Sequence, residues 1–147
     1  MELAIFCNWI FASTTARFGQ PEIQLAVFPP PASVILPLKL GQGRADHLCL
    51  TGESWTAEQA LETGLVQDVS EDPAAALDAF VQTHLLKKSA SSLRMAVRAA
   101  RCNFNAALRQ QLPQVERLYI DELMSTHDAN EGIGAFLEKR KPRWTND

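Results

Sequence analysis

Residues 18–23, Phe-Gly-Gln-Pro-Glu-Ile, are the most informative stretch of this chain, together with Glu-Leu-Ala at residues 2–4. Each stretch places one carboxylate, Glu22 or Glu2, beside apolar residues. A carboxylate in apolar surroundings binds its proton more tightly and can act as a general acid. Two such groups that face one pocket can divide the acid and base roles. Spacing alone leaves open that both are ordinary surface and turn residues, because the chain carries 17 acidic side chains.

Composition indicates one globular domain. The chain has 147 residues, of which 46% are hydrophobic and 21% charged, so global disorder is excluded. Its net charge of −3 argues against a dedicated nucleic-acid binder, which needs clustered Lys and Arg. The apolar run at residues 3–12 follows an acidic residue and is far shorter than the roughly 20 residues of a membrane span. We therefore expect a soluble, cytoplasmic protein without membrane association.

Cysteine and histidine spacing predicts neither a disulfide nor a metal site. The three cysteines, Cys7, Cys49 and Cys102, are widely separated and form no CxxC pair, which favours reduced and buried thiols. The three histidines have no close ligand spacing, so we expect no metal.

Helices dominate the predicted secondary structure after an irregular, aromatic-rich first third. Thr56 and Gln59 have the spacing of a capping box, and Asp72 followed by Pro73 is typical of a helix start. Asp128 and Glu131 are predicted to cap the last helix. The predicted elements are helices at 57–63, 73–86, 91–101, 104–124 (kinked or split by Pro113) and 128–139, and a strand at 65–69.

The start of the chain is abrupt. Residues 1–4 enter an apolar stretch with no capping residue and no leader. We expect that further sequence precedes Met1 in the natural protein.

Several collinear motifs add to the first two stretches. They are Leu-Thr-Gly at 50–52, Ala-Glu-Gln-Ala at 57–60, Gly-Leu-Val at 64–66 and Glu-Gly-Ile-Gly-Ala-Phe-Leu-Glu-Lys-Arg at 131–140. With them, essentially the whole chain resembles the crotonase (enoyl-CoA hydratase/isomerase) superfamily. The resemblance implies the C-terminal portion of an α/β crotonase fold, a ββα spiral, that is mainly helical with a few short strands. It also implies a single domain fragment, with the end of the spiral core at 1–70 and a helical oligomerisation region at 71–147.

The resemblance also implies roles for the two glutamates. Glu2 and Glu22 occupy the family's two catalytic positions, where both carboxylates hold the attacking water and share the proton transfers. The enolate-like thioester needs an oxyanion hole of backbone N–H donors, and in the family these donors lie upstream of Met1. Coenzyme A arrives as part of the acyl-CoA substrate, so no separate cofactor is expected.

The segment at residues 27–37, Val-Phe-Pro-Pro-Pro-Ala-Ser-Val-Ile-Leu-Pro, departs from the glycine-rich stretch of common enoyl-CoA hydratases. Because prolines fix φ and lack a donor, we expect a stiffer wall there. The pattern is similar to the branch that hydrates cyclohexa-1,5-diene-1-carbonyl-CoA in benzoyl-CoA degradation, part of aromatic catabolism. A structural loop variant in a generic hydratase is the alternative.

The C-terminal helices suggest further contacts. In the resembled family they form a trimer, or a dimer of trimers, and approach the coenzyme A of a neighbouring subunit. Phe136 and Lys139 are therefore cofactor-binding candidates, although a basic helix end is usually just solvated. Two alternative functions stay open: other crotonase chemistry, such as double-bond isomerisation or ring-opening hydrolysis, and a non-catalytic oligomerisation module.

Overall fold

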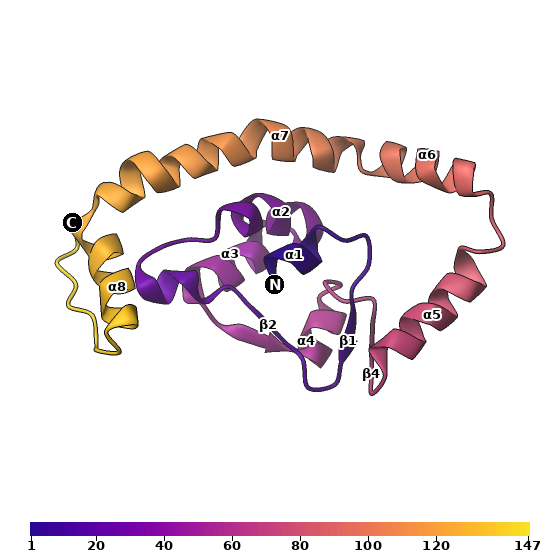
Figure 1. Ribbon diagram of the computed structural model, residues 1–147, viewed down its shortest axis with the longest axis horizontal. Helices are drawn as coiled ribbons and strands as arrows, with labels where there is room; N and C mark the ends of the chain where they lie inside the picture. The colour runs from indigo at the N-terminus through magenta and orange to yellow at the C-terminus, as the bar shows by residue number, and fades with distance from the viewer.

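The computed structural model describes residues 1–147, and its N-terminal half is built around one apolar core (Figure 1). Four side chains at its centre, Ile5, Ile35, Leu36 and Leu48, are completely buried. The elements of this half are α1 (Glu2–Ile5), β1 (Phe11–Ser13), β2 (Arg17–Gly19), the 3-10 helix η1 (Pro21–Leu25), α2 (Pro30–Leu40), α3 (Gln42–Thr51), β3 (Ser54–Thr56), α4 (Ala57–Glu62) and β4 (Asp68–Ser70). Helix α2 packs against α1 and α3, so the core lies between these helices and the short strands.

The four strands form two separate pairs. β1 pairs in parallel with β4, with Phe11 opposite Asp68. β2 pairs antiparallel with β3, with Phe18 opposite Trp55, and both of these aromatic side chains are buried. Because β2 continues directly into η1, this second pair fixes the direction in which the chain enters the segment that carries Glu22.

The C-terminal half is an arc of helices that curves around the core (Figure 1). It consists of α5 (Pro73–His84), α6 (Ala90–Ala100), α7 (Cys102–Arg117), the π-helix η2 (Leu118–Glu122), the 3-10 helix η3 (Leu123–Ser125) and α8 (His127–Leu137). α7 packs on α2, and α8 packs on η1. α5 is attached through Phe80, whose ring lies 4.9 Å from that of Trp9 and 5.4 Å from that of Phe11, both in edge contacts. No helix of the chain combines the length and apolar character needed to cross a bilayer.

Local sequence signals located several helices correctly. Thr56 and Gln59 form the predicted capping box at α4, and the side chain of Asp72 caps α5, which begins at Pro73. α6 also lies within one residue of its predicted bounds. These predicted helices are confirmed. They could be found from the sequence because helix start signals act within a single turn.

Two predicted elements differ from the structure. The strand occupies Asp68–Ser70 rather than 65–69, because Leu65 and Val66 are buried in a turn and donate their N–H groups to the carbonyl of Ala60. Pro113 was predicted to kink or split its helix, and it does not split it, since α7 is continuous through this residue. The carbonyl that loses its helical donor to Pro113 belongs to Arg109, an exposed residue whose carbonyl water can solvate.

The first third is more regular than the irregular segment that the sequence pattern had suggested. Residues 30–40 and 42–51 form the helices α2 and α3. Pro30 and Pro31 occupy the first two positions of α2, where a missing N–H costs no helical hydrogen bond. The proline-rich segment is therefore the start of a buried helix, and its stiffness comes from that helix.

The prediction of buried thiols is wrong for two cysteines. Cys7 and Cys102 are exposed, and only Cys49 is partly buried, on α3. Cys7 follows the short α1, and Cys102 begins α7 on the outer arc, so neither position faces the core.

Candidate functional site

Glu2 is held at the start of α2. Its Oε1 accepts a hydrogen bond of 3.2 Å from the backbone N–H of Ala32, the third residue of α2. Pro30 and Pro31 have no N–H to offer, so Ala32 provides the first free donor of the helix. The positive end of the helix dipole also favours a carboxylate here. This arrangement fixes the carboxylate through one oxygen and leaves the other oxygen free for a ligand.

Glu22 lies in η1 and carries an unsatisfied buried atom. Its Oε2 is buried without a hydrogen-bond partner, and so is Nε2 of the neighbouring Gln20, a side chain that is 1% exposed. η1 is tied to the end of α3 by a 3.2 Å hydrogen bond from Gln24 Nε2 to the carbonyl of Gly52. Buried polar atoms without partners are rare in folded proteins, and water or a ligand commonly satisfies them. The free oxygen of Glu22 therefore marks a place where a polar ligand can bind.

Cys49 is a partly buried thiol that is affected by the charges of both glutamates. Burial is the largest cause that raises the pKa of its thiol to about 11, followed by the negative charges of Glu22, Asp46 and Glu2. A hydrogen bond with the side chain of Ser33 opposes this shift. Glu2 and Glu22, from α1 and η1, thus both lie within electrostatic reach of one thiol. The same environment keeps Cys49 protonated at neutral pH, so this thiol is not a nucleophile.

A hollow of about 350 Å³ opens beside Glu22. It is lined by Pro21, Glu22, Gln24, Leu25 and Phe136. Phe136 reaches it from α8. This helix can approach η1 closely because residue 132 is glycine, and a Cβ at this position would collide with the carbonyl of Leu25. The structure thus brings together Glu22 and one of the two predicted cofactor-binding residues.

Lys139 is not among the residues that line this hollow. It follows α8 in the left-handed conformation, with φ of 54°, and its backbone N–H donates to the carbonyl of Phe136. Its predicted contact with a cofactor stays a prediction.

Neither Cys49 nor Gln20 was singled out in the sequence analysis. Gln20 belongs to the 18–23 stretch, and its burial gave no separate signal there. Cys49 follows directly after Leu48, a residue on the buried face of α3, and this neighbour is the signal that could have pointed to it.

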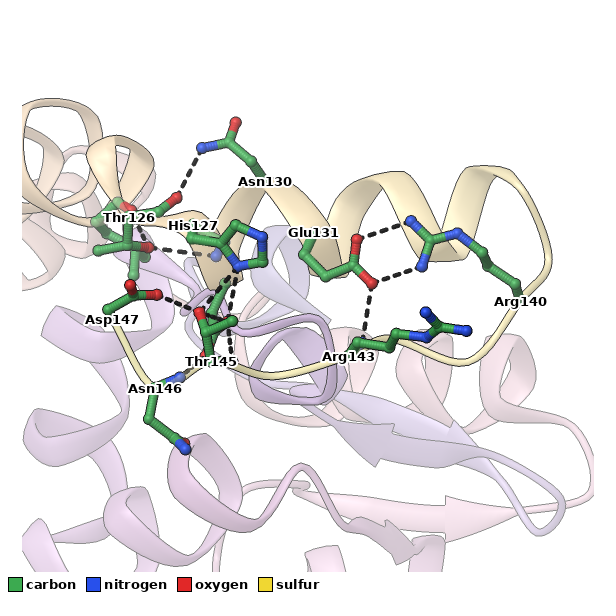
Figure 2. Close-up of polar contacts among 12 residues, drawn as sticks. Thr126, His127, Asn130, Glu131, Arg140, Arg143, Thr145, Asn146 and Asp147 are labelled. Atoms are coloured by element: carbon green, nitrogen blue, oxygen red, sulfur yellow. Dashed lines mark hydrogen bonds and ion pairs between the residues drawn. The ribbon is translucent and has the colours of Figure 1, made fainter.

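The C-terminal tail is bound to α8 by two carboxylates (Figure 2). Glu131 forms a bidentate pair with Arg140, with distances of 2.5 and 2.7 Å, and accepts the N–H of Arg143. Asp128 accepts the N–H groups of Thr145 and Asn146 at 2.8 and 2.9 Å.

The predicted capping role of Asp128 and Glu131 is therefore wrong. Thr126 caps α8, because its hydroxyl accepts the N–H of Ala129. His127, Asp128 and Asp147 bring possible metal-ligand atoms within 4.8 Å of one another. Since Asp128 already binds the tail, we assign no metal to this cluster, and the expected absence of a metal site stays a prediction.

Attachment of the tail is expected to fail only in strong acid. The hydrogen bond from Arg140 lowers the pKa of Glu131 to about 2, and the N–H of Thr145 lowers that of Asp128 to about 2. Carboxyl groups with depressed pKa values stabilise the folded state above their unfolded pKa values of about 4, and this contribution disappears as the pH falls through about 2. NMR titration of the Thr145 and Asn146 amides should therefore show a transition near pH 2. A midpoint near pH 4 would contradict this, and Asp128→Asn should perturb both amides at neutral pH.

Comparison with known proteins gives a consistent result. The family model described as enoyl-CoA hydratase/isomerase matches residues 1–147. The chain is 47% identical over 146 residues to cyclohexa-1,5-dienecarbonyl-CoA hydratase of Thauera aromatica, and 37% identical over 143 residues to 2,3-dehydroadipyl-CoA hydratase of Escherichia coli. These alignments cover 99% and 96% of this chain, but only 57% and 56% of the relatives. The chain therefore spans a little more than half the length of these relatives.

Solved structures agree with the sequence relatives. Carnitinyl-CoA hydratase from Mycobacterium avium matches with a TM-score of 0.86 and 27% identity, over 99% of this chain and 57% of that structure. An enoyl-CoA hydratase structure from Mycobacterium avium paratuberculosis matches with a TM-score of 0.87 and 29% identity, with the same coverage. The predicted fold, the C-terminal portion of an α/β spiral that is mainly helical with a few short strands, is confirmed.

Proposed function

The chain belongs to the enoyl-CoA hydratase/isomerase family, and on this basis we propose that it carries the acid and base groups of an acyl-CoA hydratase. Such a lyase adds water to the double bond of an α,β-unsaturated CoA thioester. One observation carries the proposal: Oε2 of Glu22 is buried without a hydrogen-bond partner. The negative charges of Glu22 and Glu2 both act on the thiol of Cys49. Two carboxylates at one place, one anchored and one with an unsatisfied oxygen, are suited to hold a water molecule and share its protons.

The reaction requires two proton transfers. The oxygen of the bound water forms a bond to the β-carbon, and one carboxylate accepts a proton from that water. The electron pair of the double bond moves to the α-carbon and the thioester carbonyl, and the other carboxyl group supplies a proton to the α-carbon. Glu2 and Glu22 would take these roles, with the backbone donors for the enolate oxygen upstream of Met1. Water addition changes no overall oxidation state, so the proposal includes no redox cofactor.

A cyclic, conjugated dienoyl-CoA is our proposed substrate. The chain is 47% identical to a relative named for a cyclohexadiene substrate, compared with 37% for the dehydroadipyl-CoA relative. The second support is the proline start of α2, which lies directly beside the carboxylate of Glu2. Two adjacent prolines give this part of the site a rigid backbone that suits a rigid ring.

A substrate comparison with the full-length natural protein, its chain established by intact mass, tests the proposal. We expect water addition to cyclohexa-1,5-diene-1-carbonyl-CoA with a kcat/KM at least about tenfold above that for crotonyl-CoA, because pocket shape alone discriminates to this degree. A 3-enoyl-CoA serves as the third substrate. Preference for crotonyl-CoA would overturn the cyclic substrate. Isomerisation without hydration, a ring-opened product or no turnover at all would overturn the hydratase itself.

We also propose that the helical region, residues 71–147, contacts other copies of the chain in a trimer or a dimer of trimers. α5 and α6 bury no residue in the single chain. Apolar side chains along the outer arc are exposed, among them Met95, Leu118 and Ile120.

Phe136 is 64% exposed beside the hollow at Glu22, which supports its proposed contact with coenzyme A.

A further inference from the structure

The helix that carries Glu2 depends on tertiary contacts for its position. One of its side chains, Ile5, is fully buried in the core. The hydrogen bond from Ala32 to Glu2 holds its first turn. Its other end must be held as well, since the carboxylate moves with the helix.

Two cationic side chains bind the backbone directly after α1. Arg101 Nη2 donates a hydrogen bond of 2.8 Å to the carbonyl of Phe6, and Lys39 Nζ donates one of 2.8 Å to the carbonyl of Cys7. These carbonyls lie at the negative end of α1, where cations are favoured. Hydrogen bonds with a charged donor are stronger than neutral ones.

The two cations come from distant parts of the chain. Lys39 lies in the last turn of α2, the same helix whose first turn binds Glu2. α2 therefore holds α1 at both ends. Arg101 lies at the junction of α6 and α7, 95 residues along the sequence from Phe6, and it links α1 to the outer arc of helices (Figure 1).

The guanidinium of Arg101 is well fixed. It lies over the ring of Phe104, 4.1 Å from the ring centroid. Arg101 and Lys39 line a hollow of about 300 Å³ that contains no acidic residue, and neither forms an ion pair. Burial lowers the pKa of Lys39, and the nearby charge of Arg101 lowers it further. Cys7 opposes this shift. The two carbonyls after α1 accept hydrogen bonds from both cations.

We propose that Arg101 is a positioning residue for Glu2, which acts through the carbonyl of Phe6 and makes the placement of the carboxylate depend on the α6–α7 junction. This inference rests on the proposed function of Glu2. A displacement of about 1 Å at a reacting group can reduce a rate by about 10²-fold. Loss of one of the three polar anchors of α1 should therefore affect turnover more than binding.

The test uses the full-length protein with Arg101→Met and Arg101→Lys. Methionine keeps an apolar contact with Phe104 but cannot bind the carbonyl, whereas lysine keeps a charged donor. We expect Arg101→Met to lower kcat for enoyl-CoA hydration about tenfold with KM unchanged, and Arg101→Lys to recover most of the loss. The matched control is Arg98→Met, because the guanidinium of Arg98 forms its hydrogen bond with Met95 on its own helix.

Hydrogen exchange provides a readout that does not depend on activity. In Arg101→Met the amides of Ile5, Phe6 and Cys7 should exchange faster, while those of α2 and α3 should not change. Faster exchange throughout the core, unchanged exchange at these three amides, or an equal effect of Arg98→Met would overturn the positioning role. If the wild-type protein is inactive but Arg101→Met still shows the local change in exchange, the proposed function is overturned and the structural anchor stands.

Discussion

Replacement of Glu22 by Gln is expected to lower kcat for hydration by about 10²- to 10⁴-fold with little change in KM. The amide is nearly isosteric with the carboxylate, so it preserves the shape of η1 and of the hollow beside it. It cannot accept a proton from water or return one to carbon. Because Oε2 of Glu22 has no partner in the protein, no structural hydrogen bond is lost with it.

Steady-state kinetics of the full-length protein with its best enoyl-CoA will check this expectation. Glu62→Gln is the matched control, because Glu62 is an exposed carboxylate on α4 outside the hollow. An active Glu22→Gln variant with wild-type kcat would remove Glu22 from the chemistry. A large rise in KM with unchanged kcat would indicate a binding role instead.

Replacement of Glu2 has two separable consequences, since its carboxylate both lies in the site and binds α2. In Glu2→Gln the amide oxygen can still accept the N–H of Ala32, so only proton transfer is lost. We expect kcat to fall by about 10²- to 10⁴-fold. In Glu2→Ala the anchor is lost as well, and the free energy of unfolding should fall by about 0.5–2 kcal/mol, the usual effect of losing a helix cap.

Urea unfolding combined with steady-state kinetics separates these two effects. Glu2→Gln should have the free energy of unfolding of the wild type. Its kcat should be as low as that of Glu2→Ala. Equal stability of Glu2→Ala and wild type would contradict the anchoring contact. Full activity of Glu2→Gln would contradict the proton transfer and leave Glu2 with a structural role only.

The fold was predictable where a helix carries its own start signal. Thr56 and Asp72 act on N–H groups within one turn, and the helices after them were found. α2 was missed because three adjacent prolines suggest a loop, and only burial of residues such as Ile35 and Leu36 reveals the helix. Tertiary packing outweighs local preference at such positions.

The site was predictable only in its residue types. The resemblance identified Glu2 and Glu22, but their placement depends on how α1 packs on α2 and η1 on α3. Asp128 and Glu131 show the opposite failure. Their spacing suggested a helix cap, whereas the returning tail provides their partners from residues more than one turn away.

The parallel pairing of β1 with β4 has a consequence for the order of folding. Residues 14–67 lie between these strands, so pairing β1 with β4 closes a long loop. The chain loses the entropy of closing this loop before the strands gain any contact. Contacts this distant in sequence slow folding, because their entropy is lost first. α2, α3 and the β2–β3 pair can form within that loop and shorten the remaining search. We therefore expect the pairing of β1 with β4 to form late, and α5, which contacts β1 through Phe80, to dock after it.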